Sequence, residues 1–145
     1  SNLGKVVATD KKSDSISDGT VQWSHVGPAE GVGGVQGFRP LDNRRGTKNI
    51  QFSDPKSKAP QRSKMSYRFY CTQPQKVVLS ANRRFTMELE ITASNDWQSM
   101  TLPAKQLLSH GAGLSDWSVA DSMGIMPKPG FDITKVIFAE FKWVE

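Results

Sequence analysis

The sequence predicts an all-β protein, an antiparallel β-sandwich of the jelly-roll type, and three observations support this class. Several segments alternate large apolar residues with polar ones, which is the period of a strand with one buried face. Eight prolines and twelve glycines interrupt the chain and leave little room for helices. The turn signals divide the sequence into about eight or nine short strands, roughly 8 to 12 residues apart, a spacing typical of a sandwich.

The first half of the chain gives weak strand signals separated by polar segments. Strands are expected at Leu3–Thr9, Thr20–Val26 and Asn49–Phe52. Loops or turns are expected at Lys11–Asp18, Gly27–Gly37, Leu41–Thr47 and Asp54–Lys64. The second half of Gly27–Gly37 also fits a bulged strand. We expect one domain over residues 1–145, with a mobile polar loop at residues 54–64.

The second half has a sharper pattern. The expected strands are, in chain order, Met65–Cys71, its hairpin partner Lys76–Ala81, Arg84–Thr92, Asp96–Pro103 and the closing Ile133–Val144. A turn is expected at Asn82–Arg83, one helical turn at Pro103–Leu108, and a long polar excursion at Ser109–Gly130. Alternation places Arg68 and Tyr70 on the outer face of the first of these strands. It places Glu88 and Glu90 on the outer face of the third.

Composition and charge argue against several classes of function. The formal net charge is +5, but the basic residues are dispersed and follow no nucleic-acid-binding motif, so a solvated basic surface is favoured over DNA or RNA binding. The single cysteine, Cys71, excludes a disulfide within the chain and is expected to be a small buried hydrophobe. No run approaches the roughly 18 to 20 apolar residues of a membrane span, so no membrane partner is expected.

Catalysis is not expected. Glu88 and Glu90 are two residues apart on one strand, so their Cβ atoms lie about 7 Å apart on one side, within reach of a glycosidase carboxylate pair. Such a pair normally flanks the scissile bond from opposing elements, whereas neighbours on one strand usually only decorate a sheet. No nucleophile elbow, phosphate loop or metal-ligand spacing is present, and His25 and His110 are too isolated to define a metal site.

Three features follow one another in the second half of the chain. They are the strand of small and aromatic residues Met65–Tyr70, the Trp-led strand Asp96–Pro103, and Pro129–Lys135, which leads into the closing strand. In this order they resemble the jelly-roll carbohydrate-binding modules with a galactose-binding-domain-like fold, which are often appended to bacterial glycoside hydrolases. The resemblance implies that fold and a non-catalytic, carbohydrate-binding function. The N-terminal half departs from the family's pattern.

The resemblance also implies a structural calcium ion, held between an early acidic residue and a carboxylate on the closing strand. Glu140 stands near the second of these positions. Asp10, Asp14 and Asp18 are the acidic residues available for the first, and none matches it well. No cofactor or metal site is therefore assigned, and calcium is left open.

Sugar binding needs flat aromatic faces flanked by groups that hydrogen-bond hydroxyls. The candidate ligand-binding residues are Arg68, Tyr70, Glu88, Glu90, Arg83 and Trp117. The first five are expected to share one outer sheet face, and Trp117, in a polar loop, is expected either to be a ligand platform or to cover one end of the core. The alternative to a binding groove is an ordinary solvated face with an Arg68–Glu88 ion pair.

We therefore expect a non-catalytic carbohydrate-binding domain, secreted or periplasmic, that is either an accessory module of a polysaccharide-acting enzyme or a small exported protein. The competing interpretation is a protein–protein interaction or structural β-sandwich domain of a larger exported protein. No signal peptide is visible, and because the chain begins at Ser1, a processed or excised piece is expected.

Overall fold

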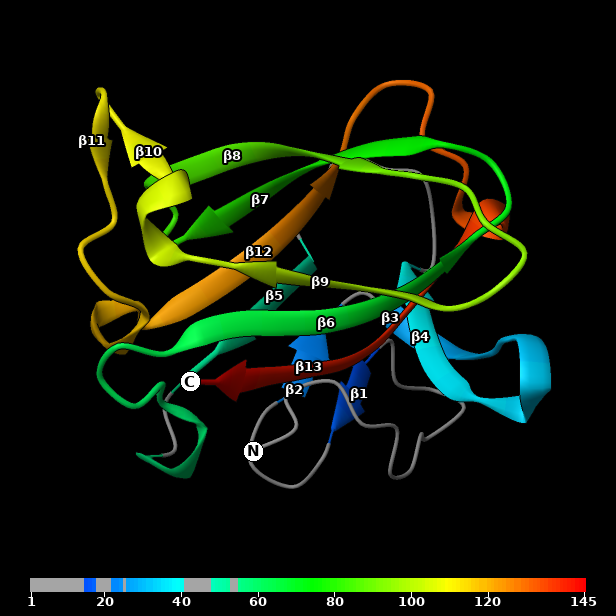
Figure 1. The fold of residues 1–145 in the computed structure, drawn as a ribbon, viewed down its shortest axis with the longest axis horizontal. Helices are drawn as coiled ribbons and strands as arrows, with labels where there is room; N and C mark the ends of the chain where they lie inside the picture. Colours follow the sequence, from blue (N-terminus) through cyan, green and yellow to red (C-terminus); the bar gives the residue numbers. More distant parts are fainter. Residues whose placement is uncertain (1–14, 18–21, 25, 41–47, 53–54) are drawn as a thin grey trace.

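The computed structural model describes residues 15–17, 22–24, 26–40, 48–52 and 55–145. Two antiparallel sheets pack face to face as the layers of a sandwich, and a separate ribbon pairs β1 (Ser15–Ser17) with β2 (Gln22–Ser24) (Figure 1). The predicted all-β antiparallel sandwich is confirmed. None of the helices in the described ranges has the length and hydrophobicity to cross a membrane.

The first layer is a five-stranded sheet in the order β3, β4, β13, β6 and β9. Its strands span Val26–Glu30 (β3), Gln36–Pro40 (β4), Val136–Val144 (β13), Lys64–Cys71 (β6) and Gln98–Leu102 (β9). The second layer is a six-stranded sheet in the order β11, β10, β8, β7, β12 and β5. Its strands span Ala112–Gly113 (β11), Leu108–Ser109 (β10), Phe85–Ile91 (β8), Gln75–Ala81 (β7), Ser122–Pro127 (β12) and Lys48–Gln51 (β5).

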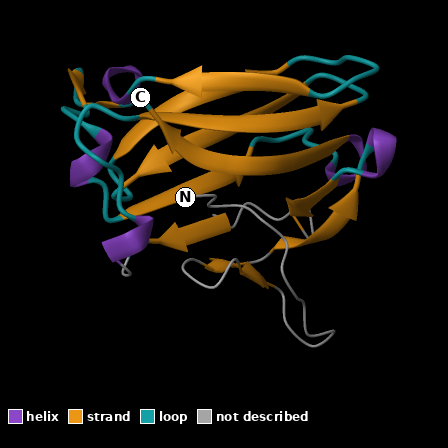
Figure 2. Ribbon diagram, turned by 60° about the horizontal axis from the view of Figure 1, so that its bottom comes forward, coloured by secondary structure: helices purple, strands orange, loops and turns teal. Residues whose placement is uncertain are grey.

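The chain passes from one layer to the other several times, as it does in a jelly roll. It crosses after β4, β5, β6, β8, β9 and β12. Single 3₁₀ turns occur at Val32–Gly34 (η1), Pro55–Ser57 (η2), Ala104–Gln106 (η3), Trp117–Val119 (η4) and Ile133–Lys135 (η5). Figure 2 shows these turns at the ends of the strands, so both broad outer faces of the sandwich stay free of helices. η3 lies within the helical turn predicted at Pro103–Leu108.

The predicted hairpin between β6 and β7 is wrong. β6 pairs with β13 and β9, whereas β7 pairs with β8 and β12 in the opposite layer. Alternation in a strand fixes which side chains face the core, but the pattern is the same whichever sheet the strand joins. The turn after β7 lies where it was predicted but is one residue longer, because Ala81 pairs with Phe85 across the three residues Asn82, Arg83 and Arg84.

The N-terminal half differs more from the sequence interpretation. The expected strand Leu3–Thr9 and turn Leu41–Thr47 lie outside the described residues. Ser15–Ser17, placed by its polar composition in a loop, forms β1 instead. The glycine-rich segment is largely strand, because β3 and β4 form a hairpin with η1 at its tip.

Aromatic rings fill the space between the two layers. Tyr67 on β6 stacks against Phe141 on β13, with ring centroids 5.0 Å apart and an interplanar angle of 14°. Phe38 on β4 packs against the same ring at 5.7 Å. Burial raises the pKa of the Tyr67 phenol far above its usual value, and the hydroxyl donates to Met100 Sδ at 3.3 Å. Cys71 is buried at the end of this strand, as predicted.

The strand β12 was missed in the sequence, although it lies in the middle of the six-stranded sheet between β7 and β5. Met123 and Ile125 point into the core, while Gly124 between them pairs with Ser80 on the outward side. With a glycine on one face and a proline at its end, this strand shows no alternation of apolar and polar residues. It was therefore placed in a polar excursion.

Two tryptophans close one end of the core. The Trp117 indole N–H donates to Leu102 O at 2.9 Å, and its ring lies 5.5 Å from that of Trp143. The Trp143 indole N–H donates to Ser57 O at 2.8 Å, which ties segment 55–63 to the core. Ser57 and Ala59 in that segment are buried, so it packs more tightly than its polar composition indicates. The mobility of residues 54–64 stays a prediction.

Truncating Trp117 to alanine is expected to lower the free energy of unfolding by about 3–5 kcal/mol. The change empties a fully buried site and leaves the Leu102 carbonyl without its donor. Urea denaturation followed by circular dichroism measures the effect. Leu108→Ala, at a residue that is 48% exposed, is the control and is expected to stay within about 0.5 kcal/mol of the parent. Equal stability of both variants would contradict the packing described.

Candidate functional site

The sequence-predicted site residues lie on opposite sides of the sandwich. Arg68 and Tyr70 project from the outer face of β6, and Glu88 and Glu90 project from the outer face of β8, both as alternation predicts. β6 and β8 belong to different layers, however, so their outer faces point away from each other. The shared groove and the Arg68–Glu88 ion pair are therefore wrong.

The outer face of the five-stranded sheet carries an aromatic cluster, defined by Arg68, Tyr70, Trp97 and Glu140. The Arg68 guanidinium lies 5.2 Å from the centroid of the Trp97 ring, and the Tyr70 ring lies 5.9 Å from that ring. Arg68 Nη1 donates to Glu140 Oε1 at 3.3 Å. The side chains of this cluster are thus engaged mainly with one another.

Trp97 is further tied down by the loop that follows β3. Its indole N–H donates to Val32 O at 3.0 Å. A Cβ atom on Gly31 would lie only 2.4 Å from Trp97 Cζ2, so only glycine lets this backbone approach the ring so closely. Trp97 therefore joins the edge strand β9 to the tip of the β3–β4 hairpin, which is a structural role.

No cluster of acidic side chains marks a calcium site among the described residues. Glu140, the carboxylate that the family resemblance points to, is paired with Arg68. No group of three or more His, Cys, Asp or Glu residues is arranged to hold a metal ion in the ranges that the structure describes. Asp10, Asp14 and Asp18, the other partners considered, lie outside those ranges.

Trp117 is not a ligand platform. Its side chain is 0% exposed and lies in the core, so of the two roles expected, covering one end of the core is the correct one. The polar side chain of Asp116 in this loop serves to hydrogen-bond the backbone. The Asp116 side chain accepts from the N–H groups of Arg62 and Ser118, and a hydrogen bond from the Ser118 hydroxyl is the main cause of its lowered pKa.

The outer face of the six-stranded sheet is mainly polar, although Val78 and Met126 also lie on it. We define the polar face by Lys76, Ser80, Thr86, Glu88, Glu90 and Lys128. Glu88 is the centre of its charges. Lys128 Nζ lies 2.6 Å from Glu88 Oε2, and Lys76 Nζ lies 4.0 Å from Glu88 Oε1. The hydrogen bond from Lys128 and its positive charge lower the pKa of Glu88. Glu90 lies opposite Lys76 in the β7–β8 register.

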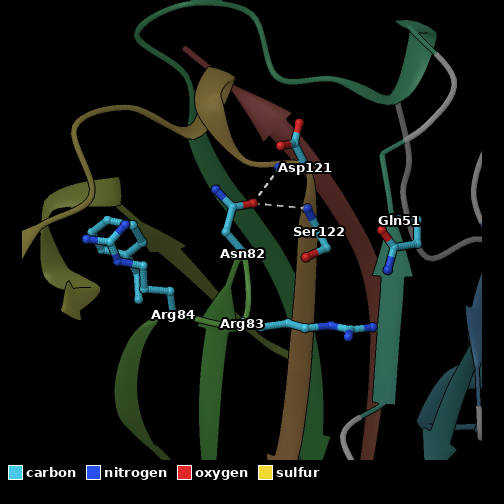
Figure 3. Close-up of a pocket in the computed structure, with 7 residues that line it drawn as sticks. Gln51, Asn82, Arg83, Arg84, Asp121 and Ser122 are labelled. Atoms are coloured by element: carbon cyan, nitrogen blue, oxygen red, sulfur yellow. Dashed lines mark hydrogen bonds between the residues drawn. The ribbon is translucent and has the colours of Figure 1, made fainter.

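An open hollow of about 470 Å³ lies at one end of this sheet (Figure 3). Residues from β5, the β7–β8 hairpin and the start of β12 line it: Gln51, Asn82, Arg83, Arg84, Phe85, Asp121 and Ser122. The lining combines amide, guanidinium, carboxylate and hydroxyl groups with one half-buried ring, that of Phe85. This hollow thus holds the mixture of hydrogen-bonding groups and apolar surface that a small polar ligand requires.

The hairpin that carries Asn82 and Arg83 is held in an unusual backbone conformation. Both residues are left-handed, with φ values of 55° and 56°, and Arg84 N donates to Ala81 O at 3.1 Å. Two left-handed residues at the centre of a four-residue turn closed by this hydrogen bond are typical of a type I′ turn, in which the second central position favours glycine. An arginine there costs about 1–2 kcal/mol in backbone conformation.

The Asn82 side chain fixes this turn against the loop before β12. Asn82 Oδ1 accepts from the N–H groups of Asp121 at 2.6 Å and Ser122 at 3.3 Å, as the dashed lines in Figure 3 mark. Asn82 Nδ2 donates to Val119 O at 3.1 Å. One amide side chain therefore satisfies three backbone groups nearly 40 residues along the chain and sets the position of the whole hairpin.

The two arginines beside Asn82 point in different directions. The Arg83 side chain extends across β12 toward β5, the strand of Gln51 (Figure 3). Arg84 instead lies over the Phe85 ring, 5.4 Å from its centroid, and Arg84 Nε donates to Ser109 Oγ at 3.3 Å. Across the hollow, Lys58 Nζ pairs with Asp121 Oδ1 at 2.7 Å.

Of the residues that line this hollow, the sequence analysis named only Arg83 as a candidate ligand-binding residue. Asn82 was recognised as a turn residue, but its bonding partners are too distant in the sequence to be paired with it. Gln51 and Asp121 gave no signal, because the neighbouring strand β12 was not recognised. The dipeptide Asn-Arg where Asn-Gly is the common hairpin sequence is the one local feature that points to this place.

A second hollow, of about 350 Å³, lies next to the turn before β6. It includes Arg62, Lys64, Lys105 and Asp116. The Asp116 carboxylate is already occupied by the backbone hydrogen bonds described above. We therefore assign this hollow a structural role and no ligand.

The fold of this chain is that of the family 11 carbohydrate-binding modules. A scan against family models finds no match, and a search of curated proteins finds none either. Among solved structures, the chain matches the family 11 module from Clostridium thermocellum in complex with a β-1,3-1,4-mixed-linked tetrasaccharide, with a TM-score of 0.54 and 15% identity over 99% of this chain and 97% of that one.

Two further structures give the same result. The family 11 module of the cellulosomal cellulase Lic26A-Cel5E of Clostridium thermocellum matches with a TM-score of 0.54 and 14% identity, over 99% of this chain and 95% of that one. The solution structure of CtCBM11 matches with a TM-score of 0.55 and 14% identity, over 98% and 93%. The likeness thus covers nearly the whole chain, including the half in which the sequence pattern departed from the family.

Replacing Asn82 with glycine is expected to lower the free energy of unfolding by about 1–3 kcal/mol. Glycine keeps the left-handed turn, so the loss reports the missing hydrogen bonds to Asp121, Ser122 and Val119. Chemical denaturation measures it. Asn95→Gly, in an exposed loop, serves as the matched control and is expected to change stability by about 0.5 kcal/mol at most. If the Asn82 variant behaved like this control, the side chain would not be what anchors the hairpin.

Proposed function

We propose that this chain is a non-catalytic polysaccharide-binding domain and that its binding surface is the hollow at Arg83 together with the adjoining polar face. The observation that carries the proposal is the hollow itself, which lies open at one end of the six-stranded sheet and is lined by amide, guanidinium and carboxylate groups. A module of the same fold has been solved with a tetrasaccharide bound. The fold is therefore compatible with a sugar-binding face.

The chemistry of the hollow suits sugar hydroxyls, each of which can donate one hydrogen bond and accept others. Gln51 offers both an amide donor and an amide acceptor, and Asp121 offers carboxylate oxygens. The Phe85 ring packs against the core and has the Arg84 guanidinium over it, so contacts with a sugar would be mainly hydrogen bonds. From the hollow, Ser80 and Thr86 extend hydroxyl groups along the sheet as direct cross-strand neighbours, so an extended chain has further partners.

The polar face is favoured over the aromatic cluster on the other layer. Rings that bind sugars must present a free face. The Trp97 ring instead has the Arg68 guanidinium over it and packs closely against Gly31. Tyr70 packs against the same ring. These contacts hold the hairpin tip and the edge strand together. The aromatic cluster is the alternative location for a ligand.

Catalysis is not proposed for this face. A glycosidase general acid needs a carboxyl group whose pKa is raised, so that it carries a proton near neutral pH. The pKa of Glu88 is lowered instead, because Lys128 donates to it. Glu88 is thus ionised and ion-paired at neutral pH. A domain that binds polysaccharide without cleaving it fits a secreted setting, next to an enzyme that acts on the polymer.

Affinity electrophoresis against a panel of neutral β-glucans and uronate-rich polysaccharides is the test. The parent chain is expected to be retarded by at least one polymer, and Gln51→Ala, which removes both hydrogen-bonding groups from the wall of the hollow, is expected to weaken retention roughly five- to tenfold. Tyr70→Ala, on the opposite layer, is the matched control and is expected to keep full retention. Loss of retention with Tyr70→Ala alone would move the site to the aromatic cluster. Retention by no polymer would refute the proposed function and favour an interaction domain.

A further inference from the structure

The hollow carries an uncompensated positive charge. Among the described residues the ion pairs join Lys58 to Asp121, Arg68 to Glu140, and both Lys76 and Lys128 to Glu88. Neither Arg83 nor Arg84 belongs to any of these pairs. The carboxylate of the hollow, Asp121, is already paired with Lys58. The two guanidinium groups at the hollow are therefore not neutralised by any described residue.

Of the two guanidinium groups, that of Arg83 is the more available to a ligand. Arg84 is held over the Phe85 ring and by its hydrogen bond to Ser109. Arg83 is exposed, and its side chain reaches over β12 into the hollow, where no hydrogen bond to another described residue fixes it (Figure 3). Of the charged groups that line the hollow, Arg83 is thus the one with neither an ion pair nor a side-chain hydrogen bond to a described residue.

The backbone under Arg83 is also strained, and the strain is imposed by its surroundings. The left-handed turn would be relieved by glycine at this position. The contacts of Asn82 with the loop before β12 hold the turn nonetheless. Left-handed residues that the surrounding structure over-determines are concentrated at sites where a side chain must be placed. Here the side chain so placed is a guanidinium over an open, polar hollow.

We propose that Arg83 binds the carboxylate of a uronic acid residue and that the ligand of this domain is an acidic polysaccharide. This inference rests on the proposed function and names its substrate class. A guanidinium presents two parallel N–H donors that match a carboxylate, which gives the pair both charge and geometric selectivity. The net charge of +5 favours the approach of a polyanion from a distance. Gln51 and the hydroxyls of the polar face remain for the sugar ring itself.

The test compares one polymer in two charge states. Polygalacturonate and its highly methyl-esterified form share a backbone, but only the first carries free carboxylates. Isothermal titration calorimetry at low salt is expected to give roughly tenfold tighter binding to the free acid. Arg83→Gly is expected to abolish this preference, and Arg83→Lys to retain about a third of it, since an ammonium lacks the planar fork. Raising the salt from about 0.05 to about 0.5 M is expected to weaken binding of the free acid.

Two controls separate recognition from general charge attraction and from misfolding. Lys142→Ala removes one positive charge from the other layer and is expected to leave the preference unchanged. Arg83→Gly is expected to melt at the parent temperature or above, because glycine relaxes the turn.

The outcomes distinguish the inference from the proposed function beneath it. Equal affinity for the two polymers, or an unchanged preference in Arg83→Gly, would overturn the recognition of an acidic group and leave polysaccharide binding intact. If Lys142→Ala weakened binding as much as Arg83→Gly, diffuse attraction of a polyanion would replace the specific contact. If the chain bound no polysaccharide at all, both the recognition of an acidic group and the proposed polysaccharide-binding function would be refuted.

Discussion

The packing of aromatic rings on the inner side of the five-stranded layer is the interaction on which the rest of this structure depends. Tyr67 lies flat against Phe141, and Phe38, Phe69 and Phe138 surround this pair. Because these rings occupy the interior, every strand that borders them must turn alternate residues outward. The position of each outward residue, on one exterior or the other, is then decided by the layer to which its strand belongs. A site on this protein is confined to one exterior face, or to an end where loops meet.

This constraint explains how far the sequence could be interpreted. Periodicity identified the inward residues of β6 and the outward positions of Arg68 and Glu88 correctly, because alternation is a property of a single strand. Whether those two residues share a face depends on strand order, which is set by long-range pairing and leaves no mark within either strand. β12 was lost for a related reason. A central strand buried on one side and bearing glycine on the other has no polar partner to alternate with.

Tryptophan shows the limit of composition as a guide to exposure. Trp117 stands among polar residues, yet its ring closes one end of the core, because Asp116 and the residues around it serve the backbone and not the solvent. Trp97 stands in a similar polar setting and does lie partly exposed, but it is engaged by Arg68 and the β3–β4 hairpin. In both cases the polar neighbours are structural partners. The hydrogen bonds that decide this join residues distant in sequence.

The placement of the hollow follows from the same long-range bonds and determines what kind of binding it supports. Asn82 joins the β7–β8 hairpin to the start of β12, and so it brings a guanidinium over the end of a sheet face that carries mainly polar and charged side chains. Such a face lacks a broad free ring for stacking, so its contacts with a glycan must be mainly hydrogen bonds and ionic pairs that compete with water. Each contact is then weak and sensitive to salt. A polymer offsets this weakness, because many repeats of one chain raise the effective concentration at a single site. Under the proposed function, an open hollow at the end of a sheet is therefore better suited to the interior of a polysaccharide than to a free monosaccharide.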